Sequence, residues 1–243
     1  MLHSVTGNKV YFVPDPSHVV KKLWNTLDNK NHMIYRDVTV DDGAGETQIH
    51  ESQLFISNIY SLFLSLNLGG CPTTFRFHKN DFVKTSFEKM RVGSCLKTLG
   101  PKMISMVREG HRRENLYKGA IGADPSGESA RAFAPWEGAY QNYRPFEEMC
   151  EHITALYNRL NSKRPPTFSA HPDRLELLAV FADAKRWFLD LREECFAQAR
   201  RETFVEPGKS LSSAQLHKYF FTSEASEDFL SMLTVIPQLV KSY

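Results

Sequence analysis

The stretch Pro145-Phe-Glu-Glu-Met-Cys-Glu-His-Ile-Thr-Ala-Leu-Tyr-Asn-Arg-Leu160 gives the clearest structural signal in the sequence. Its apolar residues recur every three or four positions, as they do on one face of an α-helix. Glu147 and Glu148 lie in the predicted first turn and Arg159 in the last, which complements the helix dipole. The stretch therefore predicts an amphipathic helix with one buried face, and it favours a mainly helical fold.

Helical signals also precede this stretch. The sequence Asp15-Pro-Ser-His18 resembles a capped helix start, and the apolar segment Val19 to Leu27 follows it. Pro101 is placed like the first-turn proline of another helix. We expect a helix after each of these starts.

The C-terminal part of the chain is also predicted to be helical. A long helix is expected from Asp173 to about Arg201, after the breaker Arg164-Pro-Pro166. An apolar tail from Phe229 to Val240 follows, and Pro237 is expected to break it. This tail suits either an ordinary core helix or an arm that packs on another subunit.

One β-hairpin is predicted near the N-terminus. Its strands are Met33 to Val40 and Gln48 to Phe55, joined across the Asp-Gly turn at 41–45. Acidic residues surround the turn: Asp37, Asp41, Asp42, Glu46 and Glu51. We interpret them as a solvated turn. An enzyme that holds a divalent metal there is an alternative, and its nuclease activity would be lost on changing Asp41 and Asp42.

Length and composition indicate one compact globular protein. Of the 243 residues, 42% are hydrophobic and 24% are charged, which excludes a disordered or fibrous chain. We divide the chain into an N-terminal segment with the hairpin and a candidate oligomerisation arm, a basic helical N-lobe, a helical C-lobe and a C-terminal helix or arm. These segments are 1–75, 76–120, 121–215 and 216–243.

Positive charge is concentrated in the middle of the chain. Overall, 30 basic and 28 acidic residues leave a formal charge of +2, but residues 76–120 hold eleven bases and four acids, a net charge of +7. Aromatic residues lie among these bases, a mixture that suits single-stranded nucleic acid because cations neutralise phosphates and rings stack on bases. The candidate RNA-binding residues are Arg76, Lys79, Lys84, Arg91, Lys97, Lys102, Arg108, Arg112, Arg113, Tyr117, Lys118, Arg131, Phe133 and Arg144.

The usual catalytic and metal-binding signatures are absent from the sequence. There is no nucleophile elbow, phosphate loop, zinc-protease motif or dinucleotide fingerprint, and the four cysteines lack paired spacing. The most apolar segment, Leu54 to Leu68, is too short to cross a bilayer. We therefore expect no enzymatic activity, no cofactor, no metal and no membrane partner.

Three short segments resemble the nucleoproteins of the phenuivirus and tenuivirus group. They are Pro101-Lys-Met-Ile-Ser-Met-Val-Arg-Glu-Gly-His-Arg-Arg113, Ser129-Ala-Arg-Ala-Phe-Ala-Pro-Trp136 and Ala179-Val-Phe-Ala-Asp-Ala-Lys-Arg-Trp-Phe-Leu189. They lie within residues 101–189, about a third of the chain, and themselves hold 32 residues. The resemblance implies a two-lobed helical core with terminal arms that coats single-stranded RNA independently of sequence and self-assembles into rings or filaments. It also implies location in the virion and host cytoplasm, and the viral polymerase as a further partner.

Other interpretations share part of this signal. The Arg-Ala-Phe-Ala-Pro pattern at 131–135 also resembles coat proteins of flexuous filamentous plant viruses, and the segment 106–115 resembles nucleoproteins of influenza-like viruses. A rival of another class is a helical adaptor or matrix-like protein that binds a protein partner or an acidic membrane through its basic block. RNA coating further requires that the basic side chains face a cleft wide enough for one strand.

Overall fold

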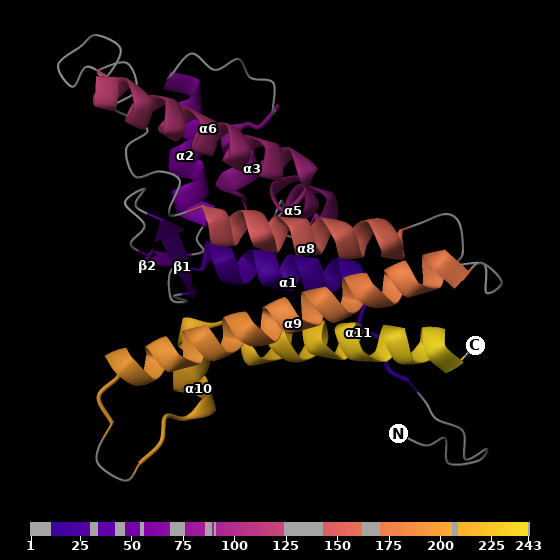
Figure 1. Ribbon diagram of the computed structural model, residues 1–243. Coiled ribbons are helices and arrows are strands. Elements are labelled where there is room, and N and C mark those ends of the chain that lie inside the picture. Colours follow the sequence, from indigo (N-terminus) through magenta and orange to yellow (C-terminus); the bar gives the residue numbers. More distant parts are fainter. Residues whose placement is uncertain are drawn as a thin grey trace, which may run out of the picture.

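The computed structural model shows a mainly helical protein with one small sheet (Figure 1). It describes residues 11–29, 34–41, 47–53, 56–68, 76–85, 89, 91–123, 143–161, 171–205 and 209–242. The elements are α1 (Pro16–Asp28), β1 (Tyr35–Asp41), β2 (Thr47–Gln53), α2 (Ile56–Leu68), α3 (Lys79–Phe82), α5 (Val92–Thr98), α6 (Pro101–Ala123), α8 (Arg144–Leu160), α9 (His171–Glu202), α10 (Ser213–Leu216), η3 (His217–Tyr219) and α11 (Ser223–Ser242). The prediction of a mainly helical fold is confirmed.

Helix α1 begins where the sequence predicts. The carboxylate of Asp15 accepts a hydrogen bond from the backbone N–H of Ser17 at 2.9 Å, and Pro16 occupies the first helical position. The face that carries Leu23 and Trp24 is fully buried. Apolar spacing and a capped start thus place α1 in the centre of the protein.

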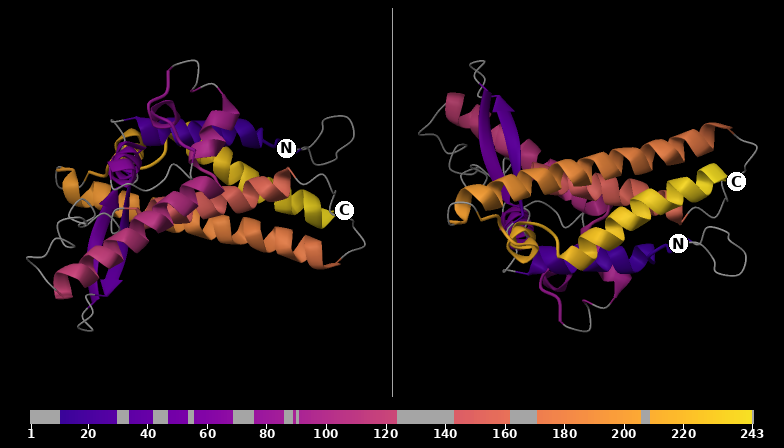
Figure 2. Two further views of the ribbon diagram at one scale, coloured as in Figure 1. Left: turned by 90° about the horizontal axis from the view of Figure 1, so that it is seen from above. Right: turned by 90° about the horizontal axis from the view of Figure 1, so that it is seen from below.

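The long helices form layers around α1 and α8. In Figure 1, α9 and α11 lie side by side on one side of this central pair, and α2, α5 and α6 lie on the other. Figure 2 shows α9 and α11 extending along the molecule while the N-terminal part of α6 packs beside α8. None of the helices within the described ranges combines the length and the apolar character that crossing a bilayer requires.

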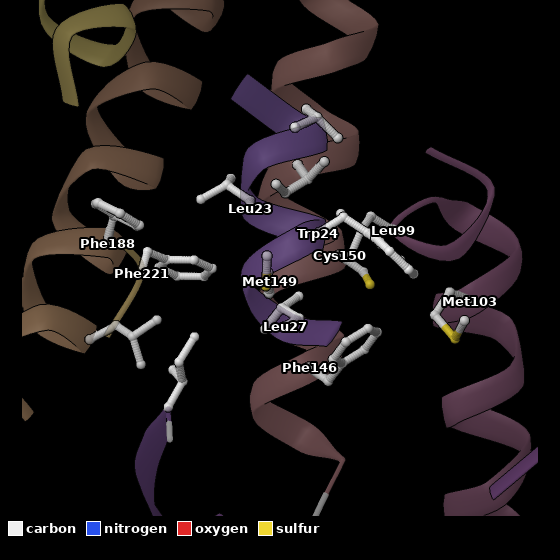
Figure 3. Close-up of a cluster of buried hydrophobic side chains, with 14 of the residues drawn as sticks. Leu23, Trp24, Leu27, Leu99, Met103, Phe146, Met149, Cys150, Phe188 and Phe221 are labelled. Atoms are coloured by element: carbon white, nitrogen blue, oxygen red, sulfur yellow. The ribbon is translucent and has the colours of Figure 1, made fainter. Parts of the chain in front are cut away.

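The layers meet in one hydrophobic core (Figure 3). Leu23 and Leu27 of α1 lie beside Met149 of α8, and Phe188 of α9 and Met103 of α6 approach from opposite sides. All five side chains are at most 1% exposed. The predicted division into two lobes is not supported, because buried residues of both predicted lobes join in this one cluster.

Strands β1 and β2 pair in antiparallel register. Tyr35 lies opposite Gln53, and Asp41 lies opposite Thr47. The sequence placed the two strands at Met33 to Val40 and Gln48 to Phe55. The residues of the turn itself, 42–46, fall outside the described residues.

The prediction that Pro237 breaks the C-terminal tail is wrong. Helix α11 begins at Ser223, before the apolar tail, and continues through Pro237 to Ser242. A proline inside a helix costs about 3 kcal/mol because it removes a backbone hydrogen bond. Ile236 and Val240, on either side of it, are partly buried against the core.

Candidate nucleic-acid interface

Helix α6 presents three of its predicted RNA-binding residues, Lys102, Arg108 and Arg112, on one exposed face. Met103, Met106 and Val107 are buried on the other side. Lys102, Ser105, Arg108 and Arg112 recur at three- and four-residue intervals and are exposed, so the helical period separates them from the core. The sequence therefore folds four polar side chains, three of them basic, into one row.

Arg108 is bound by two carboxylates of the neighbouring helix α8. Its Nε donates to Glu147 Oε1 at 2.6 Å, and a terminal nitrogen donates to Glu151 Oε1 at 2.5 Å. The hydrogen bond with Glu147 is the main cause of a raised pKa for the Arg108 guanidinium. The Arg108 side chain is still 62% exposed, so a ligand can reach it.

Arg112 and Arg113 share a carboxylate on their own helix. Arg112 donates to both oxygens of Glu109, at 2.6 and 2.7 Å, and Arg113 donates to one of them at 2.9 Å. The hydrogen bonds from Arg112, with those from Arg113, lower the pKa of Glu109 to about 2. Arg112 is 56% exposed, whereas Arg113 is 21% exposed.

Lys84 occupies a structural position. Its side chain is buried, with Nζ 3.8 Å from the centre of the Trp24 ring and 3.2 Å from the Thr98 hydroxyl. A cation held over an indole ring is stabilised by the ring quadrupole. A phosphate would have to displace this packing, and we therefore remove Lys84 from the candidate RNA contacts.

The remaining predicted residues are spread over several elements. Lys97 forms an ion pair with Asp81 at 2.5 Å, and Arg144 approaches Glu148 at 3.8 Å. Three further bases are exposed before the start of α6: Arg76, Lys79 and Arg91. For Tyr117 and Lys118 only the backbone, within α6, is described, and Arg131 and Phe133 lie outside the described residues.

Three described acids from outside the basic block, residues 76–120, lie within ion-pair distance of its bases and offset part of its +7 charge: Asp28, Glu147 and Glu151. Among the described residues, five of its bases have carboxylates within ion-pair distance: Lys89, Lys97, Arg108, Arg112 and Arg113. Sequence reasoning missed Glu147 and Glu151 as partners of Arg108, because they lie about 40 residues away along the chain. Glu109, by contrast, is three and four residues from its arginines, a spacing that predicts contact on a helix.

A separate apolar depression lies between α1, α8 and α11, around Val20, Leu156 and Phe229. None of the predicted RNA-binding residues lines it. Among the residues with described side chains, no three histidine, cysteine or acidic residues form a group that could hold a metal ion. No family model, curated protein or solved structure matches the chain.

Proposed function

We propose that the chain is a viral nucleocapsid protein that binds single-stranded RNA independently of sequence along the exposed face of α6. The observation that carries this proposal is the row of Lys102, Arg108 and Arg112 on one side of a helix. At 1.5 Å per residue, Lys102 and Arg112 lie about 15 Å apart along the axis. A run of consecutive phosphates can follow such a row, and contacts to phosphates do not depend on sequence.

The carboxylate partners of these arginines are compatible with RNA binding. Exposed ion pairs contribute only about 0 to 1 kcal/mol, because water screens both charges. A guanidinium binds a phosphate with the same two-pronged geometry that it uses for a carboxylate. RNA can therefore replace Glu151, which is 46% exposed, at Arg108 at small cost, while Glu147, which is 16% exposed, keeps its hydrogen bond from Arg108 Nε. The apolar depression between α1, α8 and α11 does not border this row, so the cleft that RNA coating requires is itself part of this proposal.

Coating of RNA also requires contact between protomers. Many weak RNA-binding sites hold one strand firmly only when neighbouring subunits also bind each other. Phe229, Met232 and Leu233 of the apolar tail are buried in the core of their own chain, so we assign the intersubunit contact to residues 1–75, where Phe12 is exposed. The ligand is single-stranded RNA, the further partners are other copies of the chain and the viral polymerase, and the location is the virion and host cytoplasm.

The test compares the wild-type chain with the double variant R112A/R113A. Binding of labelled single-stranded RNAs of several sequences is measured by anisotropy over a range of salt concentrations. We expect weaker binding for every sequence and a salt slope smaller by at least about 0.7, since each lost phosphate contact removes about 0.7 for single strands and Arg112 is the exposed member of the pair. Arg186→Ala is the matched control, because Arg186 is 73% exposed on α9, away from α6.

An unchanged salt slope in R112A/R113A would place RNA binding elsewhere on the protein. Wild-type protein that binds no RNA but binds anionic vesicles would refute the proposal and favour the matrix-like alternative. Circular dichroism of each variant checks that the helices are intact.

A further inference from the structure

A second group of cations and an aromatic ring lies where α9 ends. This group, the α9-terminal patch, consists of Arg200, Arg201, Phe204 and Lys218, all exposed. The C-terminal end of α9 lies beside α10 (Figure 1). None of the four residues belongs to the basic block of the sequence.

The Phe204 ring is exposed to solvent, and the backbone next to it is held by a hydrogen bond. Phe204 is 89% exposed. The preceding residue, Thr203, donates its backbone N–H to the carbonyl oxygen of Ala199 at 3.0 Å. An exposed phenyl ring contributes nothing to the core, and this anchoring keeps it close to the last turn of α9.

The cations of the patch differ from those of α6 in their partners. Arg200, Arg201 and Lys218 form no ion pair with any described residue, whereas Arg108, Arg112 and Arg113 each do. The nearby carboxylate of Glu202 accepts a hydrogen bond from a neutral donor, the Gln198 amide nitrogen, at 2.6 Å. A phosphate can therefore bind Arg200 and Arg201 without displacing a carboxylate from them.

We infer that the α9-terminal patch is a second contact for single-stranded RNA, in which Arg200 and Arg201 bind phosphates and Phe204 stacks on a base. This inference rests on the proposed RNA binding and adds a site that α6 does not contain. An aromatic ring next to cations is the arrangement that binds unpaired nucleotides, because every base offers a ring face and every nucleotide a phosphate.

RNA fits this patch better than a protein partner does. A stable protein interface buries about 800 Å² on each side, whereas one phenylalanine supplies at most about 250 Å². The other members of the patch are charged, and interface cores are depleted in lysine. Single-stranded RNA, which carries phosphates and unpaired bases, matches both the cations and the phenyl ring of the patch.

The test measures binding of a labelled 20-nucleotide poly-U to the full chain over a range of salt concentrations. Phe204→Ala and Phe204→Leu should each weaken binding by roughly 5- to 150-fold with an unchanged salt slope, because both remove stacking worth about 1 to 3 kcal/mol. Phe204→Trp should restore it. R200Q/R201Q should lower the slope by about 1.4, and Arg186→Gln, on the same helix, should not.

The outcomes separate this inference from the proposed function. If R112A/R113A weakens binding but R200Q/R201Q and Phe204→Ala do not, the α9-terminal patch is refuted and the α6 site stands. If Phe204→Leu binds as the wild type does, or if Phe204→Ala only dissociates protein oligomers, Phe204 contacts protein and the inference is wrong. If the wild-type chain binds no RNA, both fail.

Discussion

Replacing Glu109 with glutamine should change the stability of the protein and its affinity for RNA in opposite directions. The carboxylate accepts hydrogen bonds from both Arg112 and Arg113, which follow it on α6. Its side chain is 18% exposed. Removing its charge therefore removes a stabilising interaction and leaves two arginines without their carboxylate.

The size of the stability effect follows from the pKa of Glu109. The two arginines lower this pKa from 4.5 to about 2, and a shift of that size corresponds to about 3.4 kcal/mol at most. Solvent screening around the half-exposed Arg112 reduces this value. We expect Glu109→Gln to lower the free energy of unfolding by about 1 to 2 kcal/mol at pH 7.

The pH dependence has a defined sign. Because the pKa of Glu109 is lower in the folded protein, its stabilising contribution is complete above pH 4.5 and disappears as the pH falls from 4.5 towards 2. Urea unfolding at pH 7, 4.5 and 3 measures this contribution to the free energy of unfolding. The difference between wild type and Glu109→Gln should shrink at low pH, and Glu193→Gln, at an exposed position on α9, is the control.

RNA binding supplies the second readout. Without the Glu109 charge, poly-U should bind roughly threefold more tightly at low salt, since one repulsive charge several ångströms away is removed. Equal stability of wild type and Glu109→Gln at pH 7 would refute the ion-pair assignment. Weaker RNA binding by a folded Glu109→Gln would refute the role of the α6 face.

Three further substitutions or reagents test the packing. Lys84→Ala should lower the free energy of unfolding by about 2 kcal/mol through loss of the contact with Trp24, and RNA affinity should not change; weaker RNA binding would return Lys84 to the interface. Gly110→Ala should destabilise the protein by about 1 to 2 kcal/mol in urea unfolding, because its new Cβ would lie 2.7 Å from Leu62 Cδ1. Burial raises the pKa of the Cys150 thiol well above its usual value, so Cys150 should react with Ellman's reagent only after unfolding; rapid reaction in the native state would contradict its burial.

Local patterns in the sequence predicted the helices well. The Asp15-Pro16 start of α1, Pro101 at the start of α6 and the apolar stripe of α8 all lie where the sequence places them. Each signal acts within a few residues of chain, through capping, backbone restriction or helical period. Pro237 is the exception, because contacts with distant helices determine whether α11 continues.

The sequence could not predict which charges meet. Counting residues along the chain gives the excess of bases in 76–120, but the pairing of Arg108 with Glu147 depends on how α6 packs on α8. The burial of Lys84 depends in the same way on the position of Trp24. The α9-terminal patch was missed because its cations are few and are balanced, within residues 161–243, by an equal number of acids.

The most direct test of RNA coating is the absorbance ratio at 260 and 280 nm of the freshly purified full chain, measured before and after ribonuclease treatment and combined with electron microscopy. We predict co-purified nucleic acid in rings or filaments that ribonuclease disperses. A protein free of nucleic acid, with no assemblies after addition of single-stranded RNA, would contradict the account.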